Sequence, residues 1–318
     1  MAGAPTLEAR AARQWSAARR REAAAGVLWS LPWLLGFFIF TCGPMLASLY
    51  LAFTNYTISS SPEWVGLENF ARALSGRDDL FWSSLERTLR YALFMVPLGI
   101  GGSLLAAVAL NQRLKLTTLF RTIFFVPSLT PVVASAVIWA WLYNPNWGLL
   151  NHLLSLVGVR GPPWLADPDT AMASLMLVAL WATIGGGTMV IFLAGLQGVP
   201  KELHEAAEID GASVLQRFVT VTLPMLSPTI FFNLVIGVIA ALKVFATPVV
   251  MTGGGPNYAT WFFIQHLYQN GFQSFDFGYA SALAWVFMVL VVSLTTVNLR
   301  LSNRWVYYEG EVRRDDGT

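Results

Sequence analysis

Long apolar stretches recur along the chain, separated by shorter polar segments. Six of them can each supply the roughly 20 helical residues that cross a hydrocarbon core of about 30 Å. Inside a bilayer the backbone must satisfy its own hydrogen bonds, so each stretch predicts a helix. The six predicted spans are residues 27–53, 88–110, 122–143, 171–197, 223–245 and 277–299. The pattern predicts an all-α integral membrane protein with six transmembrane helices.

Composition supports this class. Apolar residues make up 55% of the 318, charged residues 12%, and the mean hydropathy is +0.56; these values lie outside ordinary soluble usage. Basic residues 19–21 precede the first stretch, but that stretch is too long for a signal peptide and lacks a small-residue cleavage site. Pro32 and Pro44 predict a bend in this retained span. The single cysteine, Cys42, excludes an internal disulfide.

The distribution of basic residues sets the orientation, because cytoplasmic loops of membrane proteins are rich in Lys and Arg. With both termini inside, and with Arg90 at the outer end of the second span counted as external, 14 of the 20 Lys and Arg lie inside, five lie outside and one lies in a span. Among the internal ones are Arg113, Arg313 and Arg314. We therefore expect the chain to consist of a cytoplasmic N-terminal tail (1–26), a permease domain (27–304) and a cytoplasmic C-terminal tail (305–318).

The aromatic segment 258–275 tests this topology, because it could be a seventh span. It carries Gln265, His266 and three further polar side chains, which are costly at bilayer depth. A seventh span would also place the C-terminal basic residues outside. We therefore expect a short external re-entrant or interfacial helix.

The polar loop 198–222, between the fourth and fifth spans, predicts a helix–turn–helix. Pro200 suits the first helical position, where its missing N–H costs nothing. Gly211 suits the left-handed conformation that ends many helices. Ser213 and Gln216 have the spacing of a capping box, which starts a second helix.

This loop reads Glu205-Ala206-Ala207, three residues, Gly211, nine residues, and then Val-x-Leu223-Pro224. The spacing resembles the EAA loop by which ABC-importer permeases dock on their ATPase. Further segments resemble the carbohydrate-uptake (MalF/UgpA-like) family of ABC-transporter permeases, and the resemblance covers about residues 27–304. These segments are residues 65–70, 164–168, 192–197, 209–213, 252–256 and 277–281.

The resemblance implies an ABC importer (MetI-like) permease fold with a cytoplasmic coupling helix in a prokaryotic plasma (inner) membrane. The expected partners are a second, MalG-like permease, a cytoplasmic ATPase dimer and an extracytoplasmic solute-binding protein. The ATPase would bind ATP and Mg, so this chain would hold no cofactor and would not be an enzyme. The expected cargo is an oligosaccharide, a polyol or glycerol-3-phosphate; a non-sugar solute is the alternative. The ATPase-coupling residues would be Glu205, Ala206, Ala207, Asp210, Gly211, Leu223 and Pro224.

The substrate pathway is expected to combine aromatic faces with hydrogen-bonding groups in a mostly apolar pocket. Apart from Arg90, which is counted as external, Lys243 is the single charge inside a predicted span, and it either faces the pathway or snorkels to the external interface. In the fifth span, where maltose-type members carry polar pocket residues, this chain has Gly237, Ala240, Ala241 and Val244. The pathway candidates are Trp181, Asn233, Lys243, Tyr279, Ser281 and Trp285.

Other function classes are disfavoured. A proton-coupled secondary transporter would need carboxylates or histidines in the membrane, and the six predicted spans contain none. An intramembrane hydrolase would depend on a Ser–Lys pair using Lys243. The three histidines lack metal-ligand spacing, and Glu208 and Asp210 suit a solvated face. The segment 252–256 (Thr-Gly-Gly-Gly-Pro) lacks the ending of a phosphate-binding loop and instead suggests a hinge at the pathway mouth.

Overall fold

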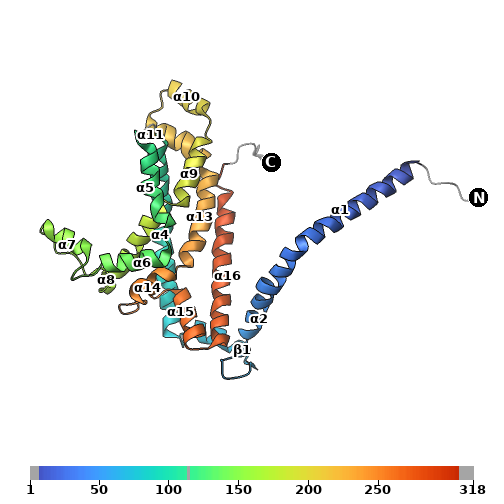
Figure 1. Ribbon diagram of the computed structural model, residues 1–318, viewed down its shortest axis with the longest axis horizontal. Coiled ribbons are helices and arrows are strands. Elements are labelled where there is room, and N and C mark those ends of the chain that lie inside the picture. Colours follow the sequence, from blue (N-terminus) through green and yellow to red (C-terminus); the bar gives the residue numbers. More distant parts are fainter. Residues whose placement is uncertain (1–6, 113–114, 308–318) are drawn as a thin grey trace, which may run out of the picture.

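The computed structural model describes residues 7–112 and 115–307, with side chains from residue 19 onward. In this part of the chain the exception to helical structure is a small antiparallel hairpin, in which Thr54 pairs with Trp64. Most helices form an upright bundle, and α1 diverges from it (Figure 1). The elements are α1 (Leu7–Phe37), the π-helical segment η1 (Phe38–Cys42), α2 (Gly43–Leu51), β1 (Thr54–Asn55), β2 (Glu63–Trp64), α3 (Glu68–Leu74), α4 (Asp79–Asn111), α5 (Thr117–Leu129), α6 (Val132–Leu142), α7 (Leu149–Leu156), α8 (Pro168–Ile184), α9 (Gly187–Gln197), α10 (Lys201–Ile209), α11 (Val214–Arg217), η2 (Phe218–Thr222), α12 (Leu223–Met225), α13 (Ser227–Leu242), α14 (Ala246–Thr252), α15 (Phe263–Tyr268), η3 (Gln269–Gln273) and α16 (Phe277–Ser302).

Three helical stretches are long and apolar enough to cross a membrane unbroken: Arg19–Leu51, Asp79–Asn111 and Phe277–Ser302. The other apolar stretches form bent pairs: α5 with α6 (98°), α8 with α9 (41°) and 214–225 with α13 (65°). The described residues therefore hold three spans, or up to six if each bent pair counts as one. The predicted helical membrane fold is confirmed, but the third, fourth and fifth predicted spans are broken helices.

The sharpest break contradicts the single helix predicted over 122–143. Thr130 separates α5 from α6 with an extended backbone (φ −77°, ψ 127°). A proline disfavours the helical conformation in the residue before it, and Pro131 follows directly. The chain turns there, and α6 lies across the bundle (Figure 1).

The break between α8 and α9 allows two backbones to meet. A Cβ atom added at Gly185 would lie 1.7 Å from the carbonyl oxygen of Phe124 on α5. One at Gly102 would lie 2.7 Å from the Ile184 side chain, so α4 also packs closely here. Gly185 and Gly102 therefore serve close helix packing at this break.

The first helix stands apart from the bundle. It curves gently from α1 through η1 into α2 (Figure 1), with Pro32 inside α1 and Pro44 in the first turn of α2. The predicted bend takes the form of this gentle curvature, and a π-helical segment lies between the two prolines. The helix begins at Leu7, before the predicted span, and its apolar window is not buried against the described part of the chain. Residues 1–6, Arg113 and the tail from residue 308, which includes Arg313 and Arg314, lie outside the described residues.

The second span also extends further than predicted. Helix α4 begins at Asp79, so Glu86, Arg87 and Arg90 lie within a helix and not in an external loop. Glu86 forms an ion pair with Arg90 one turn later. The predicted span itself, residues 88–110, contains no carboxylate, and Asp79 and Glu86 lie in the turns of α4 that precede it.

The segment 258–275 forms a short helix, as predicted. Together α15 and η3 hold 11 residues, or about 16 Å of helix, which cannot cross a bilayer. The preceding Thr-Gly-Gly-Gly-Pro loop is closed by hydrogen bonds. The Thr252 and Thr260 hydroxyls lie 2.6 Å apart, and Thr260 donates to the Gly255 carbonyl at 2.8 Å. The loop is therefore a compact turn.

Candidate functional site

Helices α10 and α11 project from one end of the bundle (Figure 1). Helix α10 begins at Lys201, and Pro200, predicted at the first helical position, is instead the N-cap one residue earlier. At the other end, Gly211 is left-handed (φ 77°). Its N–H donates to Glu208 O at 3.0 Å, and Ala212 N–H donates to Ala207 O at 2.9 Å. This pair of bonds is a Schellman motif, so Gly211 ends the helix as predicted.

The second helix begins as its capping box predicts. The Ser213 N–H donates to Gln216 Oε1 at 2.7 Å, and the Gln216 N–H donates to Ser213 Oγ at 3.3 Å. Arg217 pairs with Glu208 at 2.5 Å and ties the two helices together. Glu208 was expected only on a solvated face; its side chain is 68% exposed but also forms this ion pair. Asp210 is exposed.

The projecting loop exposes apolar side chains. Ile209 is 87% exposed, Val214 75% and Leu215 72%. Glu205 and Ala206 are exposed and Ala207 is half-buried. Such a contiguous apolar surface is typical of a protein interaction site. Leu223 and Pro224 lie apart from it, in α12, where the chain re-enters the bundle.

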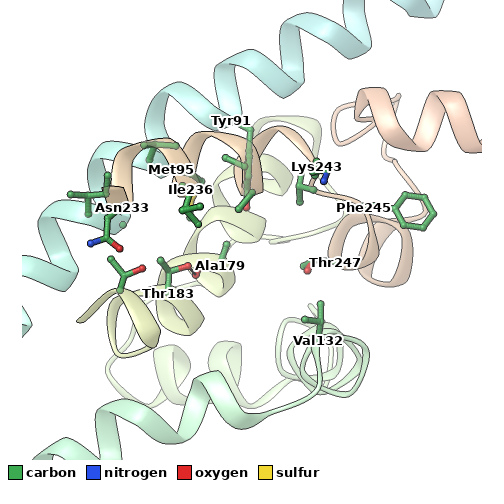
Figure 2. A pocket seen from close by; sticks show the side chains of 18 of the residues that line it. Tyr91, Met95, Val132, Ala179, Thr183, Asn233, Ile236, Lys243, Phe245 and Thr247 are labelled. Atoms are coloured by element: carbon green, nitrogen blue, oxygen red, sulfur yellow. Dashed lines mark hydrogen bonds between the residues drawn. The ribbon is translucent and has the colours of Figure 1, made fainter. Parts of the chain in front are cut away.

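A cavity of about 520 Å³ lies further along the bundle, between α4, α8, α13 and the start of α14 (Figure 2). Two of the six pathway candidates, Asn233 and Lys243, line it. The four small or apolar positions noted in the fifth span also line it. The lining residues are Tyr91, Met95, Val96, Gly99, Ile100, Val132, Ala179, Thr183, Thr188, Asn233, Ile236, Gly237, Ala240, Ala241, Lys243, Val244, Phe245, Ala246 and Thr247.

The other four candidates lie elsewhere. Trp181 packs edge-on against Trp139, with ring centroids 5.4 Å apart. Trp285 Nε1 donates to Ser48 Oγ at 3.3 Å. Tyr279 is fully buried, and Ser281 is half-buried. None of the four is among the described residues that line the cavity.

The cavity residues Thr188 and Thr247 are not among the six predicted pathway candidates. Thr247 follows Lys243 by four residues, but a break between α13 and α14 separates them. Periodicity therefore gives no signal that the two share one wall.

A polar network at the opposite end of the bundle from α10 was also missed. Asp78 caps α4 by accepting from Leu80 N–H at 3.0 Å. Its Oδ2 atom also lies 2.7 Å from His266 Nε2 and 2.5 Å from the Tyr279 hydroxyl. Burial raises the pKa of Asp78, but the hydrogen bonds from His266 and Tyr279 outweigh it and lower this pKa to about 2. Nearby, Arg72 pairs with Asp276 at 2.9 Å. These contacts hold α3, α4, α15 and α16 together.

Residues 99–306 match the model of the family described as "Binding-protein-dependent transport system inner membrane component". The chain is 40% identical over 296 residues to the probable ABC transporter permease protein YesP of Bacillus subtilis, covering 92% of this chain and 94% of that protein. It is 37% identical over 296 residues to the trehalose/maltose transport system permease protein MalF of Thermococcus litoralis, covering 93% and 96%. A solved structure of a bacterial ABC transporter that imports the acidic polysaccharide alginate has the same fold. Its TM-score is 0.80 at 23% identity, with 92% of this chain and 99% of that chain covered.

Proposed function

The chain belongs to the family of binding-protein-dependent transport system inner membrane components, as its EAA spacing predicts, and we propose that it is the permease subunit of a sugar importer. It would move substrate inward by alternating access. ATP would be bound and hydrolysed, with Mg, by a separate cytoplasmic ATPase dimer. A solute-binding protein would deliver the sugar at the opposite mouth.

The observation that carries this proposal is the projecting loop. Its first helix ends in a Schellman motif and exposes Ile209, and its second helix exposes Val214 and Leu215. These side chains have no partner surface in the described chain. Burying these side chains against an ATPase would be favourable by about 1.5–3 kcal/mol each. The coupling residues would be Glu205, Ala206, Ala207, Asp210 and Gly211, with Leu223 and Pro224 linking the loop to the fifth span.

The exposed apolar surface of the first helix is evidence for a second permease subunit. Its apolar side chains include Trp29, 86% exposed, and Phe40, 80% exposed. Lipid can cover such a helix, but α1 diverges from the bundle (Figure 1), which leaves room for another membrane subunit between them. We propose a heterodimer with a MalG-like permease.

Orientation follows from this assignment. The loop, the C-terminal end of α16 and the N-terminal end of α1 would all lie on the ATPase side. Arg19, Arg20 and Arg21 begin the first candidate span there, in line with the cytoplasmic excess of Lys and Arg. Both termini would therefore be cytoplasmic, and the hairpin and α15 would face the binding protein.

The sugar assignment rests on the relatives and on the chemistry of the cavity. The Thermococcus protein, at 37% identity, is named for trehalose and maltose. The cavity of about 520 Å³ is mostly apolar with a few polar side chains, which is typical of small-molecule sites. A non-sugar solute remains the second candidate.

The test is Gly211→Arg in the complete transporter reconstituted in lipid. Open space surrounds Gly211, but its φ of 77° strains any other residue, at a cost of about 1–2 kcal/mol. The variant should insert at wild-type levels and lose ATP-driven uptake together with substrate-stimulated ATPase activity.

The matched control is Gly158→Arg. Gly158 has the same φ (77°) and open surroundings, but it lies just after α7, away from the loop. Uptake by this variant should be unchanged. Normal uptake by Gly211→Arg, or purification without any ATPase subunit, would overturn the coupling assignment.

A further inference from the structure

The cavity carries a positive charge without a counter-charge. Among its described lining residues, Lys243 is the single charged side chain, and none is Asp or Glu. The ion pairs in residues 7–112 and 115–307 all join other residues, so no described carboxylate oxygen lies within 4.0 Å of the Lys243 ammonium. In apolar surroundings an unpaired ammonium attracts an anion more strongly than it would in water.

The Lys243 side chain is exposed, and its placement favours a cavity-facing role. It lies at the C-terminal end of α13, beyond Leu242. A separate groove on another face of α13 is lined by Leu234, Val238 and Leu242, and Lys243 does not take part in it. Lys243 instead shares the cavity wall with Ala240 and Val244. Of the two roles considered from the sequence, the geometry favours the one that faces the pathway.

Hydroxyl groups accompany the charge. Thr247, in the first turn of α14, lines the cavity near Lys243 (Figure 2), and its side chain has no hydrogen-bond partner in the described ranges. Thr188 on α9 also lines the cavity, and its hydroxyl is similarly without a partner within the described residues. Hydroxyls next to an ammonium can donate to a bound anion, and bonds to charged groups are the stronger ones.

The far end of the cavity wall is polar but neutral. Asn233 donates through Nδ2 to Thr229 O at 2.9 Å, which leaves its Oδ1 as an acceptor. Ten residues of helix separate Asn233 from Lys243, or about 15 Å, and Figure 2 shows the two toward opposite ends of the cavity. Between them the wall is formed by Ile236, Gly237 and Ala240. A ligand that reached both polar ends would be longer than one sugar ring.

We propose that this cavity selects an acidic saccharide of two or more rings. Its carboxylate, phosphate or sulfonate binds Lys243 and Thr247, and its hydroxyls reach Asn233. A neutral sugar bound in this part of the cavity would cover the exposed Lys243 ammonium without pairing it, which is costly. The inference rests on the proposed importer function and adds the charge of the substrate to it.

The experiment measures uptake by the complete transporter, with its binding protein, in proteoliposomes. The probes are matched pairs: digalacturonate and trigalacturonate against the neutral galactose disaccharide and trisaccharide, and phosphorylated or sulfonated disaccharides against their unmodified forms. We expect uptake of an acidic member of the panel. Lys243→Met should lower that uptake about 10- to 100-fold, the worth of a hydrogen bond to a charged group, and Lys243→Arg should retain most of it.

Lys115→Met is the control, because Lys115 is exposed near the start of α5; it should leave uptake unchanged. If Lys243→Met fails to assemble, Thr247→Val removes the neighbouring hydroxyl and should cost about tenfold. Wild-type uptake of neutral sugars alone would overturn the inference. Equal losses of neutral-sugar and acidic-sugar uptake in Lys243→Met would also overturn it. That result would indicate that Lys243 contacts the partner permease and not the substrate. In both of these outcomes ATP-driven uptake persists, so the proposed importer function stands. The importer function fails only if no ATPase associates with the protein.

Discussion

The hydroxyl of Tyr279 donates a hydrogen bond to Oδ2 of Asp78 at 2.5 Å, although 201 residues separate the two in the chain. The same oxygen lies 2.7 Å from His266 Nε2, and the second oxygen caps the first turn of α4. One carboxylate therefore joins the beginnings of α4 and α16 to α15. These contacts fix the end of the bundle that we assign to the binding protein.

Replacing Asp78 should destabilise this end of the molecule. In Asp78→Ala the buried Tyr279 hydroxyl and His266 ring lose their partner, and we expect unfolding to become easier by about 1–3 kcal/mol. The measurement is the midpoint temperature of thermal unfolding in detergent. Asp79→Ala is the control, because Asp79 is exposed and its change should be within about 0.5 kcal/mol. Equal midpoints for the two variants would contradict the role of the network.

The same carboxylate should make stability depend on acid pH. The pKa of Asp78 is lowered to about 2 in the folded protein, against about 3.9 for an unfolded chain. A lowered folded pKa means that the stabilisation is fully present above about pH 4 and is lost as pH falls toward 2. The stability difference between wild type and Asp78→Asn should therefore shrink between pH 5 and pH 2. Denaturant unfolding at pH 5, 4, 3 and 2 measures it, and a constant difference would refute the linkage.

Gly185 should tolerate no side chain. Its Cβ would lie 1.7 Å from a backbone oxygen of α5, which cannot move aside as a flexible side chain can. We expect Gly185→Ala to lower the unfolding free energy by about 1–3 kcal/mol. Gly101→Ala is the matched control, since nothing lies within 4 Å of its added Cβ atom. Thermal unfolding of both variants checks this, and a Gly185→Ala midpoint equal to that of Gly101→Ala would show that α5 does not pack as described.

Some features could be predicted because they depend on neighbouring residues. The capping box of Ser213 and Gln216 and the helix end at Gly211 involve residues within about five positions of each other, so local sequence determines them. The apolar stretches predicted the helical membrane class for the same reason, because each helix satisfies its own backbone. Hydropathy averages over a window, however, and it did not detect that Pro131 divides the third stretch into two helices.

By itself, then, the sequence determined the membrane class, the permease family and the local form of the projecting loop. Tertiary structure alone decided which of the pathway candidates share a cavity. Asn233 and Lys243 both line it, as do Thr188 and Thr247. Tyr279 instead donates a hydrogen bond to Asp78, and Trp285 donates one to Ser48. The physical reason is that a cavity and a buried network join side chains across helix breaks and long sequence separations. Their partners are set by how the helices pack, and no periodicity along one segment carries that information.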